Sequence, residues 1–172
     1  KDGYLWLTGR AKDLIIRGGH NIDPSLIEDA IAGHQDIAAV GAIGQPDPKS
    51  GEVPCAYVQL VDGSGATEKD IFDFANESIG EEAARPKHVE ILNEMPLTNV
   101  GKIFKPELRK IAITRVLNNH FKDKGLSASI KYVREDKSLG LVACVSGGQE
   151  EKEKVKKVLG AYSTPWEFID LV

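Results

Sequence analysis

The chain has 172 residues, of which 41% are hydrophobic and 28% are charged. These fractions are typical of a globular protein with one domain or two small ones. The net charge of −4 argues against a generally basic, nucleic-acid-binding surface, although local basic patches remain compatible with a phosphorylated ligand. No apolar stretch could span a bilayer and no secretory leader is visible, so we expect a cytoplasmic protein. The chain opens at Lys1 without an initiator Met, which we interpret as a cut inside a longer protein.

The spacing of apolar residues predicts short strands and helices along the first part of the chain. Thr67 is the expected N-cap of one helix, and Gly33 is the expected end of another. The segment rich in Pro, Asp and Gly at residues 45–51 is predicted to be a loop, and residues 93–104 a long polar loop. Strands are expected over residues 4–8, 13–17, 37–43, 53–61 and 88–92, and helices over residues 24–32 and 68–79.

The remainder of the chain repeats the same order of elements. We expect a helix over residues 106–122, a hairpin of strands 127–134 and 139–146, a helix over 149–159 and a strand over 166–172. The order helix–strand–strand–helix–strand therefore occurs twice, which predicts an α+β fold with small mixed sheets, flanking helices and two tandem α-β-β-α-β units. This order leaves open whether the two units share one sheet.

The cysteines and histidines give no pattern of a metal site. Cys55 and Cys144 each lie in an alternating apolar run, so we expect buried thiols in strands. Neither belongs to a CxxC spacing, and the histidines lack ligand spacing as well. We therefore predict no bound metal from the four histidines, which are His20, His34, His88 and His120.

Two short segments contain residues suited to chemistry on a phosphorylated ligand. In PLTNVGKIFK, Gly101 precedes Lys102 in a polar loop, so the ammonium group would sit on a flexible arm. A compact cation can stabilise a phosphate or a growing phosphoryl charge, although a loop lysine taken alone is more often a solvated surface charge. In the second segment, Gly18 and Gly19 permit backbone angles that a Cβ atom would forbid.

Both segments match motifs of one enzyme superfamily. PLTNVGKIFKPELR, residues 96–109, resembles the last conserved motif of the adenylate-forming enzymes, which include acyl-CoA synthetases, firefly-type luciferases and adenylation domains of peptide synthetases. GRAKDLIIRGGHNIDPSLIE, residues 9–28, resembles their hinge and glycine loop. Residues 37–60 also fit the family pattern, and the resemblance extends to about Lys110. The chain therefore looks like the C-terminal domain of an AMP-forming acyl-CoA synthetase.

The resemblance implies a role for individual residues. Lys102 would be the catalytic lysine, bridging the substrate carboxylate and the α-phosphate of ATP during adenylation. Arg10 would contact the ribose of the adenylate, with an ordinary surface arginine as the alternative. Lys12 falls at the hinge, about which the domain would rotate between two half-reactions.

The glycine loop would serve the second half-reaction. Gly18 and Gly19 would line the tunnel for the pantetheine arm of CoA, the alternative being an ordinary hairpin bend. His20 lies in this loop, either in contact with CoA or the nucleotide or as a bystander. Glu28 would be structural or would help to position the loop. Leu26 stands where relatives often carry an acidic residue, and we expect altered packing there rather than lost chemistry.

We expect three parts of the chain and several ligands for the whole enzyme. Residues 1–12 would end the N-terminal domain and form the hinge, residues 13–110 would form the lid domain, and residues 111–172 an additional α+β extension of open function. The resemblance implies ATP, CoA, a carboxylic acid that is most simply a fatty acid, and Mg²⁺ bound mainly by the N-terminal domain. That domain's phosphate loop and acyl pocket are absent here, so the isolated chain is expected to be inactive. The alternatives are an adenylation domain that loads a carrier protein, a luciferase-like enzyme, and a non-catalytic α+β binding module.

Overall fold

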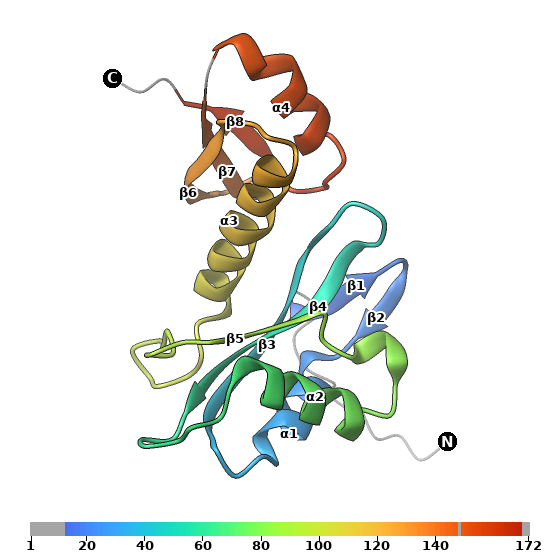
Figure 1. Ribbon diagram of the computed structural model, residues 1–172, viewed down its shortest axis with the longest axis vertical. Coiled ribbons are helices and arrows are strands. Elements are labelled where there is room, and N and C mark those ends of the chain that lie inside the picture. The colour runs from blue at the N-terminus through green and yellow to red at the C-terminus, as the bar shows by residue number, and fades with distance from the viewer. Residues whose placement is uncertain (1–12, 148, 170–172) are drawn as a thin grey trace. The chain divides into compact units, whose positions relative to one another are not determined.

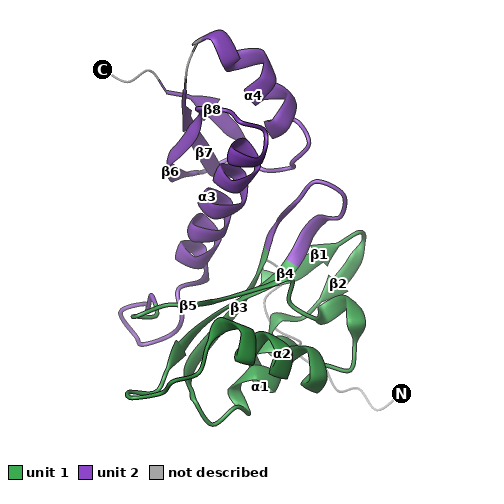
Figure 2. Ribbon diagram, viewed as in Figure 1, with its two compact units in different colours: residues 1–44, 54–95 green, residues 45–53, 96–172 purple. Residues whose placement is uncertain are grey.

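The computed structural model describes residues 13–147 and 149–169, which form an α+β fold (Figure 1). The chain divides into two compact units (Figure 2). The first comprises residues 1–44 and 54–95, and the second comprises residues 45–53 and 96–172. There are two separate sheets, a five-stranded one that lies mostly in the first unit and a three-stranded one in the second, so the two predicted α-β-β-α-β units do not share a sheet.

The first unit contains five strands and two helices. The strand order is β2-β1-β4-β3, and β5 pairs in parallel with β4. Hairpin β1–β2 is antiparallel. A 3-10 turn, Glu82–Ala84, lies between the second helix and the last strand. The elements are β1 (Ile15–Arg17), β2 (His20–Ile22), α1 (Pro24–Ala32), β3 (Ile37–Asp47), β4 (Gly51–Leu60), α2 (Glu68–Ser78) and β5 (His88–Ile91).

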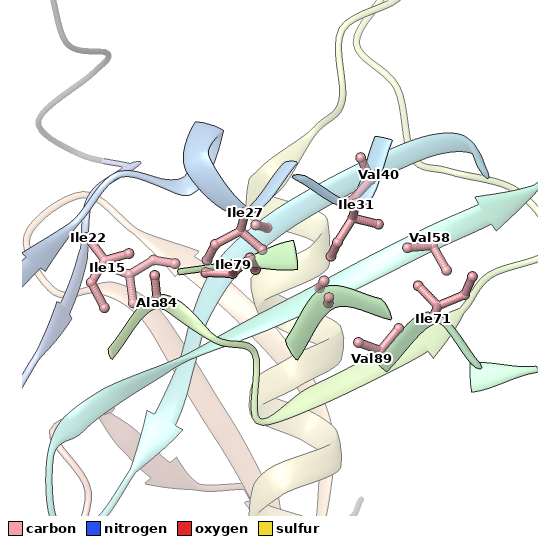
Figure 3. Packing of buried hydrophobic residues seen from close by; sticks show 13 residues of the cluster. Ile15, Ile22, Ile27, Ile31, Val40, Val58, Ile71, Ile79, Ala84 and Val89 are labelled. Atoms are coloured by element: carbon pink, nitrogen blue, oxygen red, sulfur yellow. The ribbon is translucent and has the colours of Figure 1, made fainter. Parts of the chain in front are cut away.

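Local sequence signals determine where the two helices of this unit begin. Asp23 caps α1 by accepting a hydrogen bond from the backbone N–H of Ser25, 3.0 Å away, and Pro24 occupies the first turn. Thr67 caps α2, as predicted, and the structure adds a reciprocal capping box with Asp70. Both helices pack on the sheet through aliphatic side chains (Figure 3). The fully buried members of this core include Ile15, Ile27, Ile31, Ile71, Ile79 and Ala84.

The second unit repeats the helix–hairpin–helix–strand order. Strands β6 and β7 pair antiparallel, and β8 pairs in parallel with β7, just as β5 does with β4. The core lies between the sheet and two helices, with Leu117 and Phe121 of the long helix fully buried in it. The elements are α3 (Lys105–Asp123), β6 (Ser129–Asp136), β7 (Gly140–Ser146), α4 (Lys152–Leu159) and β8 (Trp166–Phe168).

A network of charged side chains joins two strands of this sheet. Arg134 Nε lies 2.7 Å from a carboxylate oxygen of Glu167, and Arg134 Nη1 lies 2.9 Å from Asp136. These hydrogen bonds hold the pKa of Asp136 and the pKa of Glu167 below their usual range. Burial and the neighbouring Glu167 carboxylate raise the pKa of the Cys144 thiol. Cys144 is therefore a buried, protonated strand residue, and Cys55 in β4 is buried as well, as predicted.

Some element boundaries differ from those expected. Strand β3 continues to Asp47, so residues 45–47 are strand rather than loop. Pro46 is tolerated because β3 lies at the edge of the sheet, where a missing N–H breaks no ladder. These residues group with the second unit, in which Arg115 of α3 donates a 2.7 Å hydrogen bond to the side chain of Gln45.

The other differences lie near the ends of the chain. The predicted helix over 149–159 begins as a 3-10 turn, Gln149–Glu151, before α4. The last strand ends at Phe168, and the predicted strand over residues 4–8 lies outside the described residues. Helix α3 runs through Lys110 without interruption, and the domain boundary placed there stays a prediction. Within the described part of the chain, no helix combines the length and apolarity needed to cross a membrane.

Candidate functional site

Lys102 lies near the end of a tight loop that closes like a hairpin. Leu97 and Ile103 form an antiparallel bridge. Outside this bridge, the N–H of Phe104 donates to the carbonyl of Pro96 over 2.7 Å. Inside it, the N–H of Thr98 donates to the carbonyl of Lys102, also over 2.7 Å. The long polar loop predicted from sequence therefore has a defined backbone at the lysine.

Thr98 is the residue that organises this lysine hairpin, which we define as residues 96–104. Its hydroxyl oxygen accepts a hydrogen bond from the N–H of Lys102 over 3.1 Å. Its carbonyl accepts one from the N–H of Gly101 over 2.8 Å. Gly101 has a φ of 76°, in the left-handed region that favours glycine. Thr98 and Gly101 together fix the backbone that presents Lys102, while the lysine side chain itself is exposed.

Three exposed apolar side chains belong to the same hairpin as the lysine. Leu97 is 55% exposed, Val100 is 79% exposed and Phe104 is 37% exposed. Several exposed large apolar side chains within one short segment are typical of a surface that contacts another part of the protein. The lysine hairpin therefore combines one cation with an apolar rim.

The second motif forms the turn between β1 and β2, which we call the glycine hairpin, residues 15–22. Ile15 pairs with Ile22 at its base, where both side chains are buried. Gly18 and Gly19 form its tip, with φ values of 57° and 86°. A Cβ atom added at either glycine would meet no heavy atom within 4 Å. The glycines are thus required by backbone conformation, and the tip is open to an approaching ligand.

Two side chains of the glycine hairpin contact a distant segment of the first unit. Arg17 Nη1 donates to the carbonyl of Ala83 over 2.7 Å. His20 Nε2 lies 3.0 Å from a carboxylate oxygen of Glu81. Sequence reasoning singled out His20 but missed Arg17, because its acceptor is a backbone carbonyl 66 residues away.

Glu28 and Leu26 lie on helix α1 after the glycine hairpin. A carboxylate oxygen of Glu28 accepts a hydrogen bond from the N–H of Ala42 in β3 over 2.8 Å, which fits the structural role considered for this residue. Leu26 is 41% exposed, so the residue that departs from the family pattern lies on the surface of the helix.

The remaining predicted site residues fall in different parts of the chain. Lys102 belongs to the second unit, and Gly18, Gly19 and His20 belong to the first. Arg10 and Lys12 lie outside the described residues. In the ranges 13–147 and 149–169, no group of three or more His, Cys, Asp or Glu side chains could hold a metal ion.

The match to a family model defines the class of protein. Residues 26–102 match the AMP-binding enzyme C-terminal domain. This match ends at Lys102 of the lysine hairpin and begins just after the glycine hairpin. The chain therefore belongs to the adenylate-forming enzymes, as a C-terminal domain of the acyl-CoA synthetase type.

Several similar proteins have names that describe acyl-CoA ligases or synthetases. The chain is 42% identical over 147 residues to the marinolic acid–CoA ligase of Pseudoalteromonas sp. (strain SANK 73390), an alignment that covers 84% of this chain and 22% of that protein. A fatty acyl CoA synthetase of Mycobacterium tuberculosis has 35% identity and a TM-score of 0.54, covering 63% of this chain and 21% of that one. ATP-bound MatB of Rhodopseudomonas palustris has 27% identity and a TM-score of 0.55, covering 68% and 21%. The chain thus spans about a fifth of the length of these relatives.

The first of these alignments also bears on the extension after Lys110. At 84% of the chain, it is too long to fit within residues 1–110. The similarity to the marinolic acid–CoA ligase therefore continues into the extension, beyond the point at which the sequence motifs end.

Proposed function

We propose that the whole protein is an ATP-dependent acid–thiol ligase, which activates a carboxylic acid as an acyl-adenylate and transfers the acyl group to CoA. The observation that carries this proposal is the lysine hairpin, which presents an exposed Lys102 at the end of a matched AMP-binding enzyme C-terminal domain. The whole enzyme would also need an N-terminal domain with the phosphate loop, the acyl pocket and the main contacts to Mg²⁺. We propose the cytoplasm as its location.

Lys102 would act in adenylation. Attack of the carboxylate on the α-phosphate of ATP builds negative charge between the two groups, and pyrophosphate leaves. An ammonium group held between them stabilises that charge, provided that its backbone is already in place. The hydrogen bond that the Thr98 hydroxyl accepts from the N–H of Lys102 and the turn at Gly101 would supply this preorganisation.

The glycine hairpin would act in thioester formation. The CoA thiol attacks the acyl carbon of the adenylate, and AMP leaves. The pantetheine arm is thin and linear, so it needs a passage without side chains. The open tip at Gly18 and Gly19 fits this need, with His20 beside it.

The two hairpins would take turns at one active site. We propose that the domain rotates about Lys12, bringing Lys102 to the site for adenylation and the glycine hairpin for thioester formation, with Arg10 on the adenylate ribose. The apolar rim of the lysine hairpin supports docking against a second domain. Ile16 within the glycine hairpin and Leu26 shortly after it are also exposed and would offer similar apolar contacts.

The names of the relatives support a choice of acceptor and of acid. Both the marinolic acid–CoA ligase and the fatty acyl CoA synthetase have names that specify CoA chemistry, which favours CoA over a carrier protein. We propose a fatty acid or a similar acid of low polarity as the substrate. Residues that select its chain length would lie in the N-terminal domain.

The proposal is tested by assaying the full-length protein against this chain alone. With ATP, Mg²⁺, CoA and a panel of fatty acids, the full-length protein should release pyrophosphate and form acyl-CoA, measured by chromatography. The 172-residue chain alone should show neither activity, because it lacks the phosphate loop. Activity of the isolated chain, or a full-length protein without acyl-CoA formation on any acid, would contradict the proposal.

Replacing Thr98 tests the preorganisation of the lysine hairpin. Thr98→Val keeps the β-branched shape but removes the hydroxyl that accepts from the N–H of Lys102. We expect adenylation to slow by about fivefold, because the lost hydrogen bond contributes about 1 kcal/mol to holding the Lys102 backbone in the position that the ammonium group needs. Single-turnover pyrophosphate release measures the rate. Thr98→Ser, which keeps the hydroxyl, should stay within about twofold of the unchanged enzyme.

A further inference from the structure

The glycine hairpin is held differently at its base and near its tip. At the base, Ile15 and Ile22 are buried in the same core as Ile79 and Ala84 (Figure 3). At the tip, Gly18 and Gly19 have no heavy atom near the position of a Cβ. Two glycines with positive φ allow many backbone conformations in the absence of other restraints. The geometry of the tip therefore depends on the last side chains before it.

Those side chains belong to Arg17 and His20, which pair directly across the hairpin. Both reach the same segment, residues 81–84, which we call the brace. Arg17 donates to the carbonyl of Ala83 over 2.7 Å, and His20 Nε2 lies 3.0 Å from Glu81. Each arm of the hairpin is thus fastened once, at the residue next to the glycines, with Arg17 directly before Gly18 and His20 directly after Gly19.

The brace is itself well fixed. Ala84 is fully buried, and its N–H donates to the carbonyl of Glu81 over 3.0 Å. Arg85 Nε donates to the carbonyl of Ile79 over 2.9 Å. Shortly after it, the N–H of Lys87 donates to the carbonyl of Pro54 in β4 over 2.8 Å. A fixed segment that binds both arms of a flexible turn restricts the conformations of that turn.

We propose that the brace positions the glycine hairpin for thioester formation, with Arg17 as the principal positioning residue and the His20–Glu81 pair as a second fastening. This inference rests on the proposed function, because it assigns a purpose to a hairpin whose ligand would be CoA. The guanidinium of Arg17 donates to a carbonyl inside the domain, so its role is to orient the glycines rather than to react.

The contact can be tested on the chain alone by hydrogen–deuterium exchange. Arg17→Ala should raise the exchange rate of the amides at residues 18–22 by about tenfold, because the turn samples more open conformations. Glu82→Ala is the matched control, since Glu82 lies in the brace and its carboxylate has no partner among the described residues. Unchanged exchange in Arg17→Ala, or equal increases in both variants, would overturn the proposed brace.

The positioning role can be tested in the full-length ligase by separating the half-reactions. Arg17→Ala should lower kcat for thioester formation from preformed acyl-adenylate by about tenfold, since misplacement of a reacting group by a fraction of an ångström suffices. KM for CoA and the rate of adenylation should stay within about twofold, and Arg17→Lys should restore part of kcat. A rise in KM with unchanged kcat would instead make Arg17 a binding residue, and equal loss in both half-reactions would make it merely structural; both outcomes overturn the inference.

The second fastening has its own test. His20→Ala and Glu81→Ala should each lower kcat for thioester formation by about two- to threefold, and the double variant should be no slower than either single variant. Additive losses would contradict a shared contact. Absence of acyl-CoA formation by the unchanged enzyme would refute the proposed function, and the positioning role with it, whereas the exchange experiment judges the brace independently.

Discussion

Replacing Lys102 by Ala in the full-length enzyme should reduce adenylation by about 100- to 1000-fold, the usual effect of removing one preorganised charge-stabilising group. The structure gives a reason to expect a specific effect. The Lys102 side chain is exposed, and its backbone is held by Thr98 through hydrogen bonds that the substitution leaves in place. The hairpin should therefore keep its fold and lose only the ammonium group. Single-turnover release of pyrophosphate measures the loss.

The rate of thioester formation shows whether Lys102→Ala affects adenylation specifically or disrupts the whole enzyme. Lys102→Ala should change thioester formation from preformed acyl-adenylate by no more than about threefold, because a group acting only in adenylation leaves that step untouched. Lys124→Ala removes another exposed lysine of the second unit and should leave both steps unchanged. Equal losses in the two half-reactions would show that Lys102 does not have the assigned role.

Replacing Gly19 by Val should impair thioester formation and spare adenylation, the reverse of the effect expected for Lys102→Ala. Gly19 has a φ of 86°, where an L-residue costs about 1–2 kcal/mol, and a β-branched side chain is especially unfavourable there. No heavy atom lies within 4 Å of the added Cβ, so the new side chain would project into the space proposed for the pantetheine arm. We expect thioester formation to fall by about 100-fold while adenylation stays within about threefold.

A substitution at a second glycine distinguishes the effect of backbone strain from the effect of obstructing the proposed path of the pantetheine arm. Gly63 has a φ of 79° and also has no heavy atom within 4 Å of an added Cβ, but it lies in the turn between β4 and α2. Gly63→Val should lower the free energy of unfolding, measured by urea denaturation, by about as much as Gly19→Val does. It should leave the rates of both half-reactions unchanged. If Gly63→Val impaired thioester formation as strongly as Gly19→Val, strain alone would explain the loss.

Local signals in the sequence predicted much of the fold. The N-cap at Thr67, the helix over residues 24–32 and the buried thiols of Cys55 and Cys144 depend on neighbouring residues, and each was predicted correctly. The repeated helix–strand–strand–helix–strand order follows from the same local spacing. The pairing of the strands cannot be predicted from this local spacing. That β5 and β8 each lie parallel to the preceding strand depends on contacts between residues far apart in the chain.

Prolines misled the prediction at one end of β3. The run Pro-Asp-Pro at residues 46–48 is a strong turn signal, and Asp47 does form hydrogen bonds to the N–H groups of Lys49 and Ser50. The strand nevertheless continues to Asp47 because Pro46 lies on an edge strand. Whether a proline is at an edge or in the middle of a sheet depends on the tertiary fold, which local sequence does not reveal.

The candidate functional residues were identified through motifs rather than through physical reasoning on single residues. A lysine after a glycine, or two adjacent glycines, has many uses, and only the surrounding residues 96–109 and 9–28 made Lys102, Gly18 and Gly19 specific. Residues that act through the backbone escaped this approach. Arg17 donates to a backbone carbonyl, and because every residue has a backbone carbonyl, the sequence does not mark which one is the acceptor.

The discontinuous second unit constrains how this protein could be recombined with its relatives. Residues 45–53 group with residues 96–172, so a single crossover at any position separates parts of one compact unit. A crossover at Lys110 would in addition divide α3 ahead of the buried Leu117 and Phe121. A hybrid that inherits the second unit intact must therefore take two segments from the same parent, residues 45–53 and residues 96–172.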